Sequence, residues 1–237
     1  MTPRWQGWAA LRPGVLCYGG RIGATGPHAH RAAQLLTGEG LVLRGADGRD
    51  HAVRAALIPA NAPHTIVRGT ADGLLALVDP ARIGQPGRGD ATPGSAAAWR
   101  LGPDVPVTGD LDTLTALVDA LTGHVAPRPP HPALAGAERA VRRMLPGRVR
   151  LSDVARAVHL SESWLSHLFT AEFGLPFRPY VLWARLDGVW SALAAGATLT
   201  EAAHAAGFAD AAHLSRVVRR MMGNAPSTMT AGVRWLS

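Results

Sequence analysis

The sequence has no lysine and a single cysteine, Cys17, among its 237 residues. One cysteine excludes an internal disulfide framework. We expect Cys17 to be a small buried apolar residue rather than a redox-active thiol, because no basic residue flanks it closely. No apolar run approaches the roughly 20 residues of a membrane-spanning helix, and the N-terminal stretch MTPRWQGWAALRPG lacks the apolar core of a secretory signal. The sequence therefore predicts a cytoplasmic protein that does not enter a membrane.

All 24 basic residues are arginines, which we attribute to a G+C-rich genome. Their distribution is uneven. Residues 1–127 hold 11 arginines against 10 acidic residues, whereas residues 128–237 hold 13 against 7. The excess positive charge thus lies in the second half of the chain, where it would suit a surface that binds phosphate.

The stretch from Leu199 to Gly223 predicts two short helices joined by a turn at Gly207. Thr198 with Glu201 three residues later forms the pattern of a capping box, in which each side chain satisfies a free backbone amide at the helix start. In the second helix the apolar residues share one side, and the serine and arginines share the other. This is the outline of a helix-turn-helix.

The same outline occurs once more upstream, at an offset of about 48 residues. Leu151 and Asp153 match Leu199 and Glu201, and Gly174 matches Gly223. Two copies are too few for a solenoid, which needs at least three repeats to bury its core. The second half of the chain is therefore predicted to be all helical, with two tandem units joined by a helix over residues 177–195.

Residues 12–80 are rich in short apolar runs separated by Gly, Pro, Asp and Asn, a spacing typical of an antiparallel β-barrel or sandwich. Gly- and Pro-rich segments at 83–106 and 125–132 read as connections. The predicted organisation is a β-rich domain over residues 1–90, a linker with a helix over 91–127, and a helical domain over 128–237. The fold class is α+β with several domains.

An apolar stripe at helical spacing lies within the middle segment, from Leu111 to Leu121. Two interpretations remain open. The helix packs on the barrel, or its stripe pairs with a second copy of the chain in a homodimer.

Two histidines, His28 and His30, stand two residues apart, with Gln34 at a spacing that keeps it on their face if the strand continues. His64 follows in a later apolar segment. This arrangement resembles the cupin barrel, in which two histidines and an acid from one region meet a third histidine. Here Gln34 takes the place of the acid. Three interpretations stay open: a vestigial cupin pocket whose histidines hydrogen-bond each other or line a cavity for an organic ligand, a site for a divalent transition metal with Gln34 as a candidate fourth ligand, or separate surface histidines.

The two helical units carry a further ordered set of residues: a Gly-Phe pair, a Ser-Arg pair, a basic pair and a late Gly-x-x-Pro in the second, and Ser, Leu, Phe and Gly in the first. With this set, residues 151–230 resemble the DNA-binding domain of the AraC/XylS family of bacterial transcription regulators. The residues that carry the resemblance are Gly207, Phe208, Ser215, Arg216, Arg219, Arg220, Gly223, Pro226, Ser161, Leu165, Phe169 and Gly174.

The resemblance implies two recognition helices that enter successive major grooves of double-stranded DNA. It places the DNA contacts of the first helix at Ser163, Trp164, Ser166, His167 and Thr170, and those of the second at Ala212, Ser215, Arg216 and Arg219. Because the second helix begins with alanines and is rich in arginine, we expect it to contact phosphates while the first discriminates bases.

The sequence thus predicts a sequence-specific transcription regulator, not an enzyme, controlled by a small molecule or a metal in its N-terminal domain. The resemblance further implies contact with RNA polymerase and a homodimer. Two rivals are a cupin metalloenzyme fused to a DNA-binding module, and a DNA-binding protein whose N-terminal domain only dimerises. The missing carboxylate near Gln34 counts against the enzyme.

Overall fold

The computed structural model describes residues 5–80, 82, 94–123 and 131–236. They group into two compact units, one of residues 1–127 with 218–237 and the other of residues 128–217. Most of the two predicted connections, at 83–93 and 124–130, lies outside the described residues. The predicted boundaries at 90 and 127 fall there too, and stay predictions.

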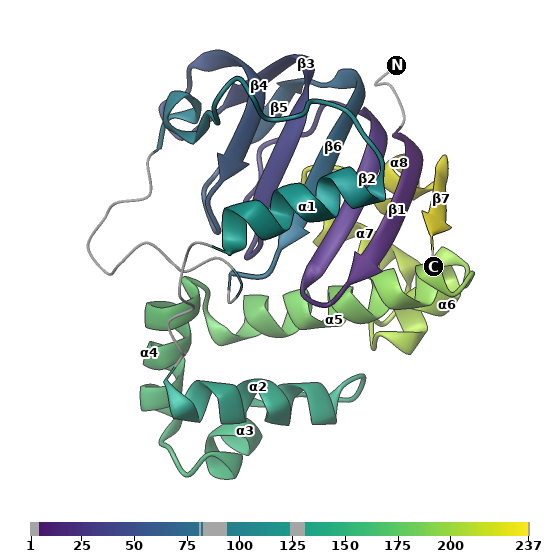
Figure 1. Cartoon of the computed structure of the whole chain (residues 1–237). Helices are drawn as coiled ribbons and strands as arrows, with labels where there is room; N and C mark the ends of the chain where they lie inside the picture. Colours follow the sequence, from purple (N-terminus) through teal and green to yellow (C-terminus); the bar gives the residue numbers. More distant parts are fainter. Residues whose placement is uncertain (1–4, 81, 83–93, 124–130, 237) are drawn as a thin grey trace. The chain divides into compact units, whose positions relative to one another are not determined.

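The first unit is built on a seven-stranded sheet in the order β4-β3-β6-β2-β1-β7, with β5 paired to β3 (Figure 1). All pairs are antiparallel except β1 with β7. The strands are β1 (Gln6–Arg12), β2 (Val15–Ile22), β3 (Ala33–Arg44), β4 (Asp50–Ile58), β5 (Thr65–Arg68), β6 (Thr70–Val78) and β7 (Val233–Leu236).

This confirms the β-rich N-terminal region but corrects the predicted barrel, since the pairings among the described strands leave the sheet open. The chain closes no ring because β4 pairs only with β3 at one end, while β7 occupies the edge of β1 at the other. The tight turn between β1 and β2 is made at Gly14, whose φ of 69° favours glycine.

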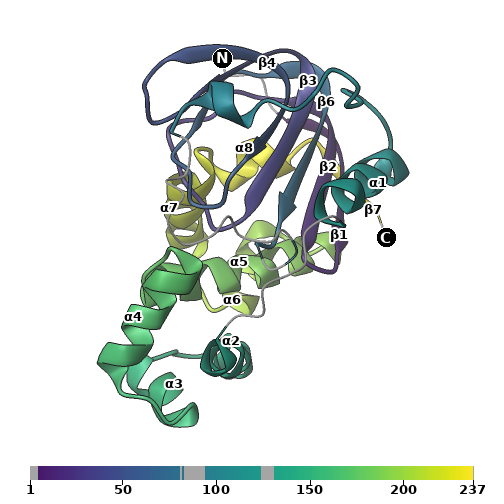
Figure 2. The same ribbon diagram turned by 60° about the vertical axis from the view of Figure 1, so that its left-hand side comes forward.

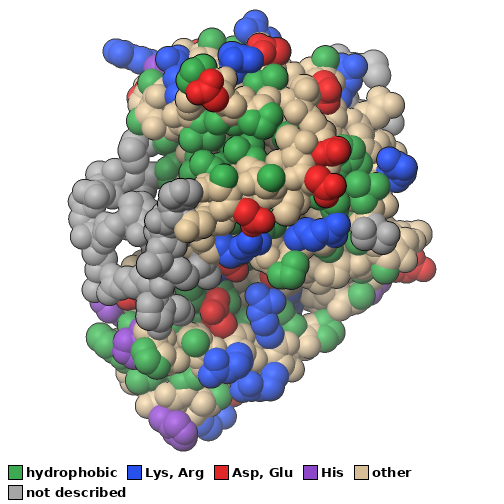
Figure 3. All heavy atoms as spheres, viewed as in Figure 1, with side chains coloured by type: hydrophobic (Ala, Val, Ile, Leu, Met, Phe, Trp, Pro, Cys, Tyr) green, Lys and Arg blue, Asp and Glu red, His purple; other side chains and the backbone are tan. Residues whose placement is uncertain are grey.

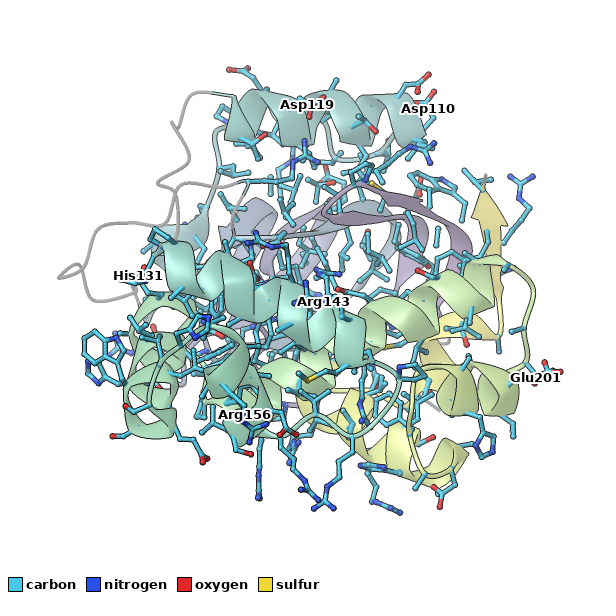
Figure 4. The ribbon with its side chains drawn as sticks, turned by 90° about the horizontal axis from the view of Figure 1, so that it is seen from below. Asp110, Asp119, His131, Arg143, Arg156 and Glu201 are labelled. Atoms are coloured by element: carbon cyan, nitrogen blue, oxygen red, sulfur yellow. The ribbon has the colours of Figure 1, made fainter. Side chains whose placement is uncertain are left out.

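Both faces of the sheet are buried, because alternate residues of each strand enter different apolar clusters. Leu35 and Leu74 lie on one face under the helix α1 (Leu111–Thr122), and their neighbours Leu36 and Leu75 lie on the other, with Trp99. Figure 1 shows α1 crossing the sheet. Asp110, labelled in Figure 4, caps α1 by accepting the backbone N–H of Thr113 at 2.9 Å.

The α1 stripe therefore packs on the sheet, which confirms the first interpretation of that helix. Leu114 and Val118 are fully enclosed in this cluster. Cys17 lies in the same cluster, and burial raises the pKa of its thiol to about 11. A thiol with so high a pKa is protonated at neutral pH, as expected for a residue that serves as packing.

Among its described residues the second unit contains five helices and the start of a sixth, and the first four helices pack around an apolar cluster that includes several aromatic rings. Phe169, Phe173 and Tyr180 have ring centroids 4.9 to 5.3 Å apart, at distances typical of favourable aromatic pairs. The helices are α2 (Pro132–Met144), α3 (Leu151–Ala157), α4 (Glu162–Phe173), α5 (Phe177–Ala194), α6 (Leu199–Ala205) and α7 (Ala211–Met222), of which the last runs on into the first unit.

The helix starts follow the sequence signals. Thr198 and Glu201 form the predicted capping box of α6, with Glu201 labelled in Figure 4. Ser161 caps α4 by accepting the N–H of Trp164 at 3.2 Å, whereas Arg150 leaves α3 without a side-chain cap. Asp210 caps α7 by accepting the N–H of His213.

After α7 the chain returns to the sheet, which the sequence did not predict. It runs through α8 (Pro226–Thr230), which Figure 2 shows, to β7, which Figure 1 shows beside β1. Val233 and Trp235 pack against the same cluster as Trp99, and the N–H of Gly7 donates to the carbonyl of Gly232 at 3.1 Å. Within the described residues, no helix is both long and apolar enough to cross a bilayer.

Candidate nucleic-acid interface and histidine cluster

The outward face of α4 carries the predicted DNA-contacting side chains. Leu165, Leu168 and Phe169 are buried, and this turns the other side of the helix to solvent. Of that side, Trp164 is the exposed large apolar residue of the described chain, at 48%. Its ring stacks on that of His167, with centroids 5.8 Å apart and planes 22° apart. The side chains of this face are Ser163, Trp164, Ser166, His167 and Thr170, of which Ser166 is half-buried.

The same division holds on α7. Leu214, Val217 and Val218 are buried. The predicted contact residues Ala212, Arg216 and Arg219 are exposed, and Ser215 is half-buried. Both predicted faces are therefore accessible. Among the residues that the structure describes, no carboxylate lies within 4 Å of the α7 arginines, so their charge is available to a ligand.

A basic groove of about 670 Å³ adjoins α4 within the same unit. Three exposed arginines line it: Arg148 and Arg150 before α3, and Arg178 at the start of α5. Ser152 and, from α4, Glu162 and Ser166 line it as well, so three arginines face one carboxylate there. Further arginines, Arg139, Arg142 and Arg143, are exposed on α2, where basic side chains gather in Figure 3 and Arg143 is labelled in Figure 4.

The histidine cluster lies in the first unit. His28, His30 and His64 are all buried, and their possible ligand atoms lie within 4.8 Å of one another. The pairing of His28 with His64 is an isolated bridge between backbones, so the predicted strand under His28 and His30 is wrong. The three rings lie together in the interior, which excludes the interpretation of separate surface histidines and leaves the pocket and the metal site open. Gln34, on β3, reaches the cluster too.

Each ring nitrogen Nδ1 of the cluster faces a backbone carbonyl. His28, His30 and His64 pair with the carbonyls of Gly26, Ala32 and Ala62 at 2.9, 2.9 and 2.8 Å. A carbonyl can only accept, so Nδ1 carries the proton in each neutral ring and Nε2 carries a lone pair. The Oε1 atom of Gln34 lies 2.9 Å from Nε2 of His30 and 3.3 Å from Nε2 of His64. The three imidazoles and the side-chain amide of Gln34 thus meet at one point.

Burial keeps these rings neutral. It lowers the pKa of His28 to about 4, with the neighbouring His30 adding to the effect. The pKa of His64 lies well below its usual value for the same reasons, and desolvation also lowers the pKa of His30. Neutral imidazoles with their lone pairs directed inward are the form that binds metal ions.

Residues 154–232 match the family model described as "Helix-turn-helix domain". The match spans both two-helix units and their linking helix. These residues form an AraC-type helix-turn-helix domain. The domain indicates a DNA-binding transcription regulator, in agreement with the resemblance found in the sequence.

Solved structures of ToxT from Vibrio cholerae share the fold. The unsaturated fatty acid-bound wild-type ToxT of strain SCE256 has a TM-score of 0.60 at 11% identity, covering 93% of this chain and 97% of that one. The apo ToxT K231A structure gives 0.58 at 11% identity, with 91% and 96% covered. At this identity the likeness concerns the fold. Comparison with curated proteins gave no match.

The basic groove beside the helix-turn-helix domain was missed in the sequence. Arg148 and Arg150 precede the matched residues, whereas Arg178 lies among them, almost 30 positions after Arg150. Only the fold brings the three arginines together. The signal available was the run PGRVR before the first helix, with two basic residues and no acid.

Proposed function

We propose that the protein is a transcription regulator that binds double-stranded DNA through α4 and α7 and responds to an effector bound at the histidine cluster. The exposed faces of two recognition helices in an AraC-type domain support the first part. The convergence of buried lone pairs on one point is the single observation that carries the second.

Base discrimination is assigned to α4. Trp164 offers an apolar surface for a thymine methyl group, and His167 and Ser166 offer groups that hydrogen-bond base edges. Phosphate binding is assigned to Arg216 and Arg219 of α7 and to the groove, since guanidinium groups match phosphate oxygens in charge and shape. The contacts at the phosphates hold the domain in register while α4 reads sequence.

A divalent transition metal is the effector that the cluster fits best. Three neutral imidazoles suit borderline ions such as zinc, copper or nickel, and the Oε1 atom of Gln34 supplies a fourth donor. The Nδ1–H···O=C bonds of all three rings are the outer contacts that commonly orient metal-ligating histidines. The ion would neutralise the mutual repulsion of the inward lone pairs. Without a carboxylate among these four donors, the occupied site would keep a positive charge.

The alternatives make different predictions. An organic effector, such as the fatty acid named for ToxT, would bind without metal and without loss on chelation. A metalloenzyme would turn over substrate when loaded with iron, nickel or manganese. A homodimer would use surfaces other than Leu114 and Val118, which the sheet already covers. Contact with RNA polymerase belongs to the same proposal and would fall on the exposed surface away from α4 and α7.

DNA binding is tested by an electrophoretic shift on the region upstream of the protein's own gene. Arg216→Ala should abolish the shift, whereas the control Arg54→Ala, which removes an exposed arginine from β4, should not. Arg219→Ala should weaken binding to all sequences alike and lower the salt slope by about one, as expected for a phosphate contact. A change in specificity alone would contradict the assignment of α7.

The effector is tested by metal analysis of protein prepared without chelator. The wild-type chain should bind close to one ion, and the double variant His28→Ala/His30→Ala should bind none. His204→Ala, which removes an exposed histidine of α6, is the matched control and should keep the ion. Equal and near-zero metal in all three proteins would refute the metal and leave the organic effector.

A further inference from the structure

We infer that the segment Ala24–His28 couples the histidine cluster directly to the C-terminal end of the recognition helix α7, so that a metal at the cluster changes how α7 is held. This inference rests on the proposed function and concerns how occupancy of the histidine cluster is transmitted to the DNA-binding helix α7. It identifies Asn224 as a positioning residue, because its contacts reach the cluster only through this segment.

The end of α7 is fastened to this segment by two hydrogen bonds. The N–H of Gly26 donates to the carbonyl of Gly223 at 2.9 Å, and the side-chain amide of Asn224 donates to the carbonyl of Ala24 at 2.8 Å. Gly223 ends α7 with a φ of 71°, and its N–H donates to the carbonyl of Arg219. The segment thus holds the residues that terminate the helix, one turn beyond the predicted phosphate contact at Arg219.

The same segment is bound to the cluster from its other side. The carbonyl of Gly26 accepts the Nδ1–H of His28 at 2.9 Å, while the backbone of His28 forms two hydrogen bonds with that of His64, at 3.0 and 2.9 Å. Gly26 is therefore held by α7 through its N–H and by the imidazole through its carbonyl. Thr25 bonds to Ile66 of β5 through both its N–H and its hydroxyl, at 2.9 and 3.0 Å.

The segment is short and has little freedom. Pro27 fixes its own φ between Gly26 and His28. Space is also tight: a Cβ atom at Gly223 would lie 2.4 Å from the carbonyl oxygen of Gly26 and 2.7 Å from Nδ1 of His28. A displacement of the His28 ring therefore cannot be absorbed by a gap, because packed groups in direct contact move together.

A metal on Nε2 gives this contact a reason to change. Coordination withdraws electrons from the imidazole, which makes Nδ1–H a stronger donor to the carbonyl of Gly26. It also draws the His28 ring towards His30 and His64, whose centroids lie 5.5 and 4.1 Å away. Both effects act on Gly26, and through its N–H on Gly223. Such a differential contact is what linkage between two sites requires.

The experiment measures hydrogen exchange in full-length protein with and without zinc or nickel ions, and follows peptides that cover residues 216–226. In the wild type, metal should slow exchange in these peptides about threefold or more. Asn224→Ala should bind the metal with unchanged stoichiometry and an affinity within about twofold, yet lose most of the slowing. Thr230→Ala is the matched control, because it removes one side-chain to backbone hydrogen bond, to Pro226, at a distance from the segment.

A second variant keeps the test decisive if Asn224 contributes little. Gly223→Ala should push both Gly26 and His28 away from the end of α7 and lower metal affinity. The corresponding Gly174→Ala at the end of α4, where φ is also positive, should reduce helix stability but leave metal affinity unchanged. Wild-type metal binding without any change in the α7 peptides would overturn the coupling while leaving the metal site intact. An absence of metal binding would instead refute the proposed effector, and with it the coupling.

Discussion

The three buried histidines have lower pKa values in the folded chain than in the unfolded chain, so their protonation differs between the two states. Their Nδ1 atoms pair with backbone carbonyls, and a proton added to the cluster is opposed by burial and, at His28 and His64, by the neighbouring rings. In the unfolded chain the same rings are solvated and titrate near their ordinary value of about 6.5. Acid therefore acts on the metal-free fold through this cluster.

The metal-free protein should lose stability as the pH falls from about 6.5 to 4. Below pH 6.5 the unfolded chain takes up a proton at His28 that the folded chain, with a pKa of about 4, refuses, so the free energy of unfolding decreases. Urea titrations at pH 7.5, 5.5 and 4.5 would measure it. His28→Asn should flatten the curve by up to about 3 kcal/mol. The exposed control His204→Ala should follow the wild type, and a His28→Asn curve parallel to both would contradict the prediction.

Among the helices, α3 and α6 show how one residue sets the start of an element. The two occupy equivalent places in the repeat, but α6 begins at the Thr198–Glu201 capping box and α3 begins at Arg150, whose side chain caps nothing. The backbone at Arg150, with φ −107° and ψ 143°, is in the extended conformation that suits a capping serine. Arg150 also lines the basic groove. We interpret the missing cap as stability given up for a phosphate contact.

Arg150→Ser should therefore change stability and DNA binding in opposite directions. The new hydroxyl would accept a free amide of α3 and raise the free energy of unfolding by about 1 kcal/mol, whereas the loss of the guanidinium should weaken DNA binding and reduce its salt slope. Thermal unfolding and fluorescence anisotropy on labelled DNA would measure the two effects. Thr198→Ala, which removes an existing cap outside the groove, should lower stability by a similar amount with little effect on DNA affinity. Wild-type DNA affinity in Arg150→Ser would exclude the groove from the interface.

The helices were predictable because their signals are local. Thr198, Glu201 and Gly207 specify the limits of α6 within ten residues of sequence, and the spacing of Leu214, Val217 and Val218 specifies the buried face of α7. The sheet was predicted only in part. Its strands have local patterns, but whether β4 meets another edge depends on pairs far apart in sequence, and the barrel was wrong for that reason.

The candidate site divides along the same line. The two exposed helix faces follow from periodicity. For His28, His30 and His64, the resemblance to the cupin barrel suggested that the three meet, but the sequence left separate surface histidines open as well. That each Nδ1 finds a carbonyl, and that Gly223 rests against His28, follows from backbone turns that no spacing rule describes. The groove of Arg148, Arg150 and Arg178 required the fold as well.

At the scale of the whole molecule, the helical unit of residues 128–217 is inserted into the first unit, since residues 218–237 pack with residues 1–127. β7 supplies the outer strand beside β1, and the backbone N–H of Trp5 donates to the carbonyl of Thr228 at 3.3 Å. A four-residue strand such as β7 carries too little periodicity to be recognised from sequence. β7 is a strand because it forms backbone hydrogen bonds with β1, which lies more than 200 residues earlier in the sequence.

Removal of all residues after Ala231 should destabilise the first unit and expose a sheet edge. β1 would lose its outer partner and keep only its pairing with β2, and the cluster around Trp99 would lose Val233 and Trp235. Unpaired edges promote aggregation, so a lower melting temperature and increased light scattering are expected. Trp235→Ala, which keeps the backbone of β7, is the control and should lower the melting temperature without the increase in scattering. Equal scattering in both variants would contradict the role of the edge.

The position of β7 also has a consequence for biosynthesis. A ribosome that adds about 5 to 20 residues per second needs on the order of 10 to 50 seconds to pass from β1 to β7. During that interval the nascent sheet has one edge open while residues 128–217 are synthesised. The first unit can therefore complete its sheet only after β7 has emerged, and not when its N-terminal strands do.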